Sequence, residues 1–142
     1  MAMNSIPAPS VPQQPDLRSF ICYDRLPAGF AAYPVMDNRS APHLQIGDVA
    51  IIDPHDTTPF EGELFLMHEG MGSDRFIINE TFTRGRIPGW CVGPVAQPSF
   101  MAGKKGRWCD FPLSTEVLEQ KLLGRVVGIL QPAFAEPMRI AA

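Results

Sequence analysis

The sequence has few of the features that announce a specific chemistry: no metal-ligand cluster and no excess of basic charge. Its three cysteines, Cys22, Cys91 and Cys109, form no C-x-x-C pair and have no histidine at metal-ligand spacing. We therefore expect no metal and no cofactor, and we expect reduced, mostly buried thiols. The formal net charge of −3 gives the chain no general attraction for nucleic acid.

Long hydrophobic runs are also missing, and the first residues have neither the basic stretch nor the apolar core of a secretion signal. These absences predict a cytoplasmic protein without membrane contact. The one basic cluster, at residues 103–107, contains two glycines and fits a solvated loop better than a phosphate clamp. We expect no direct DNA binding unless a partner supplies it.

What is present is the composition of one globular domain with flanking segments. Residues 1–17 are rich in proline, serine and glutamine, which predicts a flexible arm. Residues 18–131 are enough to form one domain with its own core. Residues 132–142, with two prolines, are predicted to be a C-terminal tail.

Short segments rich in β-branched and aromatic residues predict strands, and Gly, Pro or Asp turn residues separate them. The predicted strands are residues 20–23, 48–53, 63–69, 75–82, 90–96 and 122–130. One short helix is predicted for residues 114–121, with Ser114 as a possible cap. The sequence therefore predicts a mainly β fold, a compact set of short antiparallel or mixed strands with at most one short helix.

The most specific pattern lies in "YPVMDNRSAPHLQIGDVAIID", Tyr33 to Asp53. An apolar residue and a polar turn precede Pro42 and Leu44, and Gly47 and the aspartate after it then open an apolar strand. This order resembles the LexA/UmuD-type serine peptidase domain of the LexA/signal-peptidase-like superfamily, whose pattern is V-x-G-D-S-M-x-P-x-L-x-x-G-D. With "PFEGELFLM" and "LLGRVVGIL", the resemblance extends over residues 35–130 and implies a fold like the LexA C-terminal domain.

In this family a serine is deprotonated by a neutral lysine whose pKa is lowered by burial. Alignment on Pro42 and Leu44 puts Arg39 at the serine position. On the strand "RFIINETF", Asn79 takes the position of the lysine and Glu80 follows it. A guanidinium is neither a nucleophile nor a base, and an amide cannot take a proton from a serine at neutral pH. The resemblance therefore implies a degenerate dyad with no catalytic residue.

A rival alignment makes Ser40 the nucleophile and shifts the pattern by one residue. The candidate bases are then two lysines of the basic cluster or one of the histidines: Lys104, Lys105, His43, His55 and His68. Lys121, the remaining lysine, does not lie on the expected strand. Ala28-Gly29 resembles the small dipeptide at which family members cut themselves, but it lies too near Arg39 and fits a turn with a left-handed glycine.

Three functions remain open. The first is a catalytically inactive LexA/UmuD-like domain that acts as a regulatory or protein-interaction module. It would be phage- or SOS-related by family association alone, and a homodimer or bound to a protein partner. Residues 122–130 are either its dimer contact or plain core. The second is an active Ser40-dependent, self-cleaving peptidase. The third is a small β-barrel that binds a ligand or single-stranded nucleic acid, with Trp90, Trp108 and Phe111 stacking on bases.

The candidate binding residues are Arg39, Ser40, Asn79 and Glu80. In a former active-site cleft Arg39 could pair with a carboxylate of its own chain, such as Asp37, Asp48 or Glu80. It could instead hold an acidic group of a partner.

Overall fold

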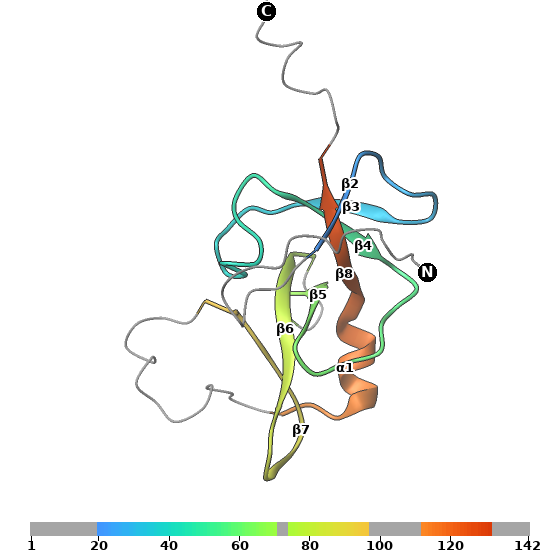
Figure 1. Cartoon of the computed structure of the whole chain (residues 1–142). Coiled ribbons are helices and arrows are strands. Elements are labelled where there is room, and N and C mark those ends of the chain that lie inside the picture. Colours follow the sequence, from blue (N-terminus) through green and yellow to red (C-terminus); the bar gives the residue numbers. More distant parts are fainter. Residues whose placement is uncertain (1–19, 71–73, 97–111, 132–142) are drawn as a thin grey trace, which may run out of the picture.

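A computed structural model of the chain describes residues 20–70, 74–96 and 112–131, which form one seven-stranded sheet and one short helix (Figure 1). The elements are β2 (Ile21–Tyr23), β3 (Ala31–Pro34), β4 (Val49–Asp53), β5 (Glu63–His68), β6 (Phe76–Arg84), β7 (Ile87–Gly93), α1 (Thr115–Lys121) and β8 (Leu122–Leu130). The predicted mainly β fold is confirmed. The predicted arm, residues 1–17, and the tail, residues 132–142, lie outside the described residues.

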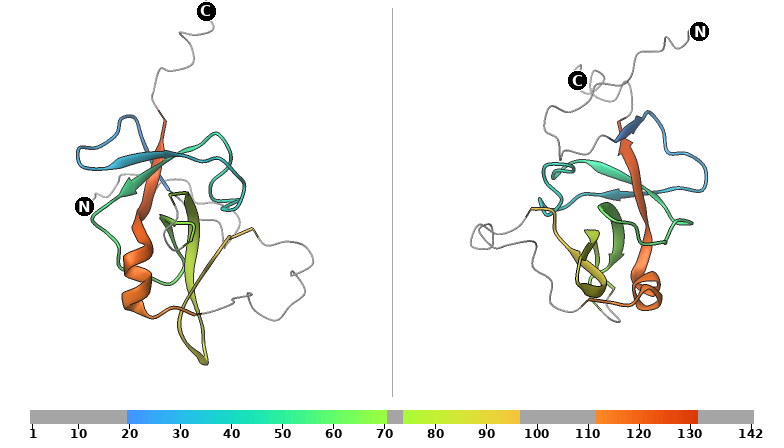
Figure 2. Two further views of the ribbon diagram at one scale, coloured as in Figure 1. Left: turned by 180° about the vertical axis from the view of Figure 1, so that it is seen from behind. Right: turned by 60° about the horizontal axis from the view of Figure 1, so that its bottom comes forward.

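Strand β8 is the centre of the sheet, whose order is β3-β4-β8-β5-β6-β7, with β2 also beside β8. β4 pairs antiparallel with one edge of β8. β5 pairs antiparallel with the first half of the other edge, and β2 pairs parallel with the second half. In the views of Figure 2, β8 runs from α1 at one end to β2 and β3 at the other. Both edges of residues 122–130 are thus used inside the chain, which favours the core reading of this segment over an edge-to-edge dimer contact.

The core lies on both faces of β5, because alternate residues of a strand point to opposite sides of the sheet. Leu64 and Leu66 join one buried cluster with residues of β4, β6 and the loop before β4. Phe65 and Met67 join a second cluster, in which Leu118 is the buried residue of α1. This two-sided burial explains why β5 is a continuous apolar run rather than an alternating one.

Helix α1 begins where the sequence predicts it. The Ser114 hydroxyl accepts a hydrogen bond from the backbone N–H of Val117 at 3.2 Å, and Glu116 lies in the first turn. The helix has seven residues. No helix within the described ranges is long and apolar enough to cross a membrane.

Two strand predictions and the cysteine prediction need correction. The sequence does not predict β3, because it is a largely exposed strand that pairs with β4 alone among the described strands and has no apolar alternation. β7 begins at Ile87 rather than at Trp90, the predicted start, so it includes Pro88 and Gly89. Cys22 is free but exposed. Cys91 is buried but disulfide-bonded, and its partner lies outside the described residues.

Candidate functional site

The loop between β3 and β4, residues 35–48, carries the residues that the sequence singles out. Its two ends continue the β3–β4 pairing: the Val35 N–H donates to the Asp48 carbonyl at 2.8 Å, and the Gly47 N–H donates to the Val35 carbonyl at 3.2 Å. Gly47 has a φ of +99°, which strongly favours glycine. Leu44 is fully buried in the first core cluster. The loop is therefore closed at its base and anchored in the core.

Polar side chains of the loop accept hydrogen bonds from backbone N–H groups of the same loop. A carboxylate oxygen of Asp37 accepts from the Arg39 N–H at 3.0 Å, and one of Asp48 accepts from the Gln45 N–H at 2.9 Å. The amide oxygen of Asn38 lies 3.4 Å from the N–H of Ile46. Such bonds hold irregular backbone in one conformation. The carboxylates of Asp37 and Asp48 are therefore used on backbone donors within the loop.

The structure brings Arg39 and Asn79 together. Nη2 of Arg39 donates to Oδ1 of Asn79 at 2.8 Å, although the two residues are 40 positions apart. Asn79 lies on β6 opposite Phe65 of β5, is 7% exposed, and its amide nitrogen lies 3.7 Å from the sulfur of Met67. The two positions that the resemblance assigns to the serine and the lysine are therefore neighbours in space.

The backbone of Arg39 is also held in place. Its carbonyl accepts a hydrogen bond from the N–H of Ala96, the last described residue before residue 112, at 2.9 Å. Three segments therefore meet at Arg39: its own loop, strand β6 and the chain that follows β7.

The remaining N–H donors of the Arg39 side chain form no such hydrogen bond within the described residues. Nε is buried and has no hydrogen-bond partner. Within the described ranges no ion pair joins the guanidinium to Asp37, Asp48 or Glu80, the three carboxylates proposed for it. The nearest polar contact is the neutral amide of Asn79.

Ser40 is buried, with only 3% of its surface exposed to solvent. Its carbonyl accepts from the backbone N–H groups of His43 and Leu44, at 2.9 and 3.1 Å, so it opens a tight turn that contains the cis peptide between Ala41 and Pro42.

The structure places two of the predicted bases, His55 and His68, in contacts with residues other than Ser40. His55 lies beside Asp53, 3.6 Å away, with its side chain 82% exposed, and His68 makes an edge-on contact with Phe76. In the part of the chain that the structure describes, no histidine or lysine side chain is hydrogen-bonded to the Ser40 hydroxyl. Lys104 and Lys105 lie outside it.

Glu80 is not part of the Arg39 site. It follows Asn79 directly on β6, and adjacent residues of a strand point to opposite faces of the sheet. Its backbone lies between Leu64 of β5 and Gly93 of β7.

Tyr33, the residue just before Pro34 at the end of β3, borders the site. Its hydroxyl donates to the carbonyl of Phe76 at 3.2 Å, which ties β3 to the start of β6. Burial raises the pKa of Tyr33 above its ordinary value of 10.0, and the carboxylates of Asp37 and Glu69 add to the rise.

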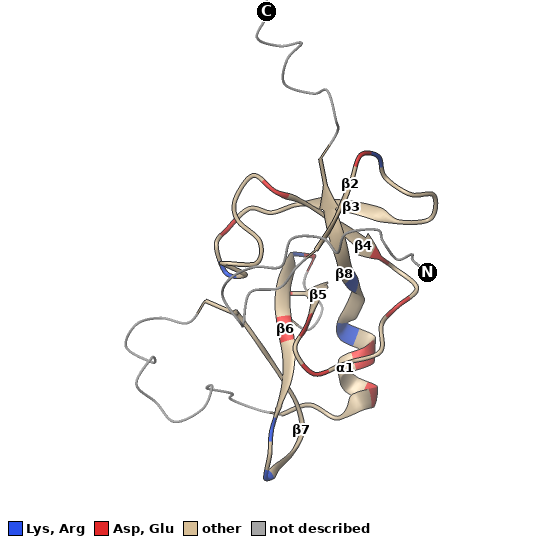
Figure 3. Cartoon of the chain, in the orientation of Figure 1, with Lys and Arg blue, Asp and Glu red and all other residues tan. Residues whose placement is uncertain are grey.

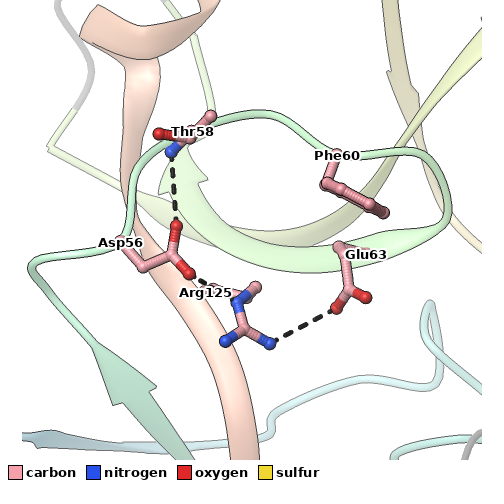
Figure 4. A pocket seen from close by; sticks show the side chains of 5 residues that line it. All are labelled: Asp56, Thr58, Phe60, Glu63 and Arg125. Atoms are coloured by element: carbon pink, nitrogen blue, oxygen red, sulfur yellow. Dashed lines mark hydrogen bonds and ion pairs between the residues drawn. The ribbon is translucent and has the colours of Figure 1, made fainter.

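A separate pocket of about 290 Å³ lies between the β4–β5 connection and β8, and its five lining residues are labelled in Figure 4: Asp56, Thr58, Phe60, Glu63 and Arg125. Nε of Arg125 lies 2.7 Å from Oδ2 of Asp56, and Nη1 lies 3.6 Å from Oε1 of Glu63. The hydrogen bond to Asp56 raises the pKa of Arg125.

The sequence reasoning missed this pocket. Its only signal was the run of acidic residues between β4 and β5, which appears in red along that connection in Figure 3. Arg125 of β8 forms ion pairs with both Asp56 and Glu63, so the cluster fastens the β4–β5 connection to β8. Among the described residues, no group of three or more His, Cys, Asp or Glu side chains could hold a metal ion.

Trp90, one of the residues expected to stack on bases in the nucleic-acid hypothesis, makes hydrogen bonds and packing contacts within the fold. Its backbone exchanges two hydrogen bonds of 2.7 Å with Leu113, and its indole N–H donates to the Thr115 hydroxyl at 3.2 Å. Its ring packs against the second core cluster. Trp108 and Phe111 lie outside the described residues.

Comparison with known proteins adds no relative, because no family model, no curated protein and no solved structure matches this chain.

Proposed function

We propose that this protein is a catalytically inactive LexA/UmuD-like peptidase domain that acts as a regulatory or protein-interaction module. The observation that supports the proposal is the 2.8 Å hydrogen bond between Arg39 and Asn79. A serine and a lysine must share a hydrogen bond to act as a dyad. The two positions that the resemblance assigns to them are in contact here, but they carry a guanidinium and an amide.

Neither side chain can perform the missing step. A guanidinium has only donors and holds its proton, so it cannot attack a carbonyl or take a proton from a nucleophile. An amide oxygen accepts a hydrogen bond but does not take up a proton near neutral pH. The pair can still position groups and bind, which is what an interaction module requires.

A homodimer or another protein is the proposed partner. Both edges of β8 are occupied, so the contact would use other surfaces. Among the described strands, β2 and β3 each pair with one strand only, so within the described residues their outer edges keep backbone donors and acceptors for a partner. Ile21 on β2 is 62% exposed. A cytoplasmic location remains a prediction, and the disulfide at Cys91 weighs against it because disulfides are rare in the reducing cytosol.

The test is reaction with a serine-reactive fluorophosphonate at neutral and alkaline pH, followed by intact mass measurement. We expect neither an adduct nor a truncated product from the wild-type chain. The double variant Arg39→Ser/Asn79→Lys serves as a matched comparison, because it puts the dyad residue types at the two contacting positions, and an adduct there would support the proposal.

The alternative is a peptidase that uses Ser40. An adduct or a discrete truncation of the wild-type chain that disappears in Ser40→Ala would overturn the proposal in its favour. The 3% exposure of Ser40 is the observation against this alternative, since a nucleophile must reach its substrate.

A further inference from the structure

We propose that Arg39 is a binding site for one carboxylate group of a partner polypeptide. This inference rests on the proposed function, because a site that performs no chemistry can serve as a recognition site. It names the chemical class that such a module would bind.

The first argument is the state of the guanidinium in the free chain. An arginine side chain has five N–H donors, and the described structure uses one of its nitrogens, Nη2, on the Asn79 oxygen. Nε is buried with no acceptor, and no acceptor is bonded to Nη1 in the described residues. Buried donors are rarely left without partners in folded proteins. Nη1 is therefore the nitrogen that offers donors to an incoming acceptor, whereas Nε is enclosed and could be reached only if neighbouring groups moved.

The second argument concerns charge. The amide of Asn79 orients the guanidinium but does not neutralise it, and no carboxylate of the described chain forms an ion pair with it. A charge that is partly removed from water is stabilised most by an opposite charge at hydrogen-bonding distance. A carboxylate matches the fork of a guanidinium and carries one negative charge against its one positive charge.

The same surroundings disfavour a phosphate. The carboxylates of Asp37 and Asp48 belong to the loop of Arg39 and are bonded to backbone donors. They add negative charge to the loop that carries Arg39, and neither forms an ion pair with the guanidinium. A doubly charged phosphate would meet this repulsion with a single cation to offset it, whereas a singly charged carboxylate would meet half of it.

The third argument is preorganisation. Hydrogen bonds from its own N–H to Asp37 and from Ala96 to its carbonyl hold the backbone of Arg39, and Asn79 holds its tip. A ligand therefore does not have to order this side chain.

Two exposed apolar side chains belong to the same loop as Arg39. Met36 and Ile46, at the two sides of the loop base, are 72% and 59% exposed. They follow and precede the hydrogen-bonded residues Val35 and Gly47, so they are neighbours on the loop surface. The combination fits an acidic residue that has an apolar residue beside it.

The experiment is a titration followed by NMR through the Nε–Hε resonance of Arg39. Sodium acetate is the minimal probe, acetamide is its neutral counterpart, and inorganic phosphate tests the rival anion. We expect acetate to shift the Arg39 signal to saturation, acetamide to leave it unchanged, and phosphate to bind more weakly than acetate. Equal shifts with acetate and acetamide, or tighter binding of phosphate, would overturn the proposal.

Two blocked tripeptides then separate the possible sources of the carboxylate. Acetyl-Leu-Glu-Leu-amide has only a side-chain carboxylate, and acetyl-Leu-Gln-Leu has only a terminal one. Each should bind at least as well as acetate if it is the natural type of ligand. Failure of both to shift the Arg39 signal would overturn the polypeptide part of the proposal.

Three variants locate the effect. Arg39→Gln should abolish the acetate dependence of the surrounding backbone amide shifts. Asn79→Asp should weaken acetate binding about tenfold or more, because it supplies an internal carboxylate to the same guanidinium. Arg75→Gln is the matched control, since the side chain of Arg75 is 81% exposed and pairs with Glu69 at 3.1 Å. Acetate binding that survives Arg39→Gln, or that Arg75→Gln weakens as much, would contradict the assignment.

The experiments distinguish failure of the proposed function from failure of the proposed carboxylate site. A Ser40-dependent phosphonate adduct would remove the inactive-module function whatever acetate does. A wild-type chain with neither an adduct nor acetate binding would keep the function and lose this site.

Discussion

Arg39 and Asn79 belong to two segments 40 residues apart, and their side chains meet in a single 2.8 Å hydrogen bond. They are also the two positions that the resemblance to LexA/UmuD-type peptidases assigns to the serine and the lysine. Because the two side chains are hydrogen-bonded, a change at either position alters the surroundings of the other. Their free energies of substitution should therefore depend on each other.

A double-mutant cycle tests this dependence. Arg39→Met or Asn79→Leu alone leaves a polar partner without its hydrogen bond, which costs about 1–3 kcal/mol of unfolding free energy. Both together replace the pair by apolar groups, so the double variant should lose less than the sum, with a coupling of about 1–2 kcal/mol. Urea unfolding of the four proteins gives the value.

The control for this cycle pairs Arg75→Met with Asn79→Leu. Arg75 forms an ion pair with Glu69, and no hydrogen bond or ion pair of the described structure joins it to Asn79. These two losses should add within about 0.5 kcal/mol. Additivity of the Arg39 cycle to the same precision would mean that the hydrogen bond does not form in solution.

Much of the sheet could be predicted from sequence because most of its strands bury apolar residues. β8 was predicted with its observed ends, Leu122 and Leu130, since its β-branched run is bounded by a helix and a polar residue. β3 could not be predicted in the same way. It is held by backbone pairing with β4, and backbone hydrogen bonds leave little trace in the side chains of an exposed edge.

Two of the four candidate residues, Arg39 and Asn79, meet in the structure, and the sequence could single them out but could not predict their contact. Arg39 and Asn79 stood out against a family pattern, yet their meeting depends on how the loop folds over β6. The sequence could not single out the residues of the second cluster, Asp56, Glu63 and Arg125. None departs from a pattern, and only the pairing of β8 with β4 and β5 brings them together.

Gly124 is predicted to be required for the close approach of β4 to β8. A Cβ atom at this position would lie 2.5 Å from the carbonyl oxygen of Asp53 and 2.6 Å from a methyl of Ile52, and backbone cannot move aside cheaply. We expect Gly124→Ala to lower the unfolding free energy by about 1–3 kcal/mol or more. Chemical denaturation measures the loss.

Gly47→Ala provides the comparison for Gly124. Nothing lies within 4 Å of its added Cβ, so the variant is strained only by the φ of +99°, at a cost of about 1–2 kcal/mol. Combining Gly124→Ala with truncation of Ile52 to alanine should leave most of the Gly124→Ala loss in place, because the Asp53 carbonyl remains. Wild-type stability of Gly124→Ala would show that β4 and β8 lie farther apart than described here.

Tyr33 should make the fold sensitive to alkaline pH. Its pKa is raised in the folded chain above 10.0, so the unfolded chain loses this proton first as the pH rises. The contribution of neutral Tyr33 to stability is complete below pH 10.0 and declines as the pH passes from there through the folded value. Tyrosinate absorbance follows this ionisation, and Tyr33→Phe isolates it because the chain has two tyrosines.

The Tyr33→Phe variant should also be less stable at neutral pH by about 0.5–1.5 kcal/mol, because the carbonyl of Phe76 loses its 3.2 Å hydrogen bond. Its stability should decline less above pH 10.0 than that of the wild type. The same alkaline decline in both proteins would assign the effect to another group.

Arg125 should tie the β4–β5 connection to β8 mainly through Asp56. The Asp56 contact is 2.7 Å and the Glu63 contact is 3.6 Å, so Asp56→Asn should destabilise the fold more than Glu63→Gln does. The side chains of Arg125 and Asp56 are 34% and 32% exposed, so water screens the pair and the loss should be no more than about 1 kcal/mol.

The pH dependence of the Arg125 pair separates it from Tyr33. The pKa of Arg125 is raised, so the guanidinium keeps its positive charge up to its ordinary value, far above neutrality, and alkaline pH should not weaken the pair in the range where Tyr33 ionises. Thermal unfolding at low and high salt should show the difference between Asp56→Asn and Glu63→Gln shrinking as salt rises. Equal losses in the two variants, or a difference that salt leaves unchanged, would mean that packing around Phe60 rather than charge holds this connection to the sheet.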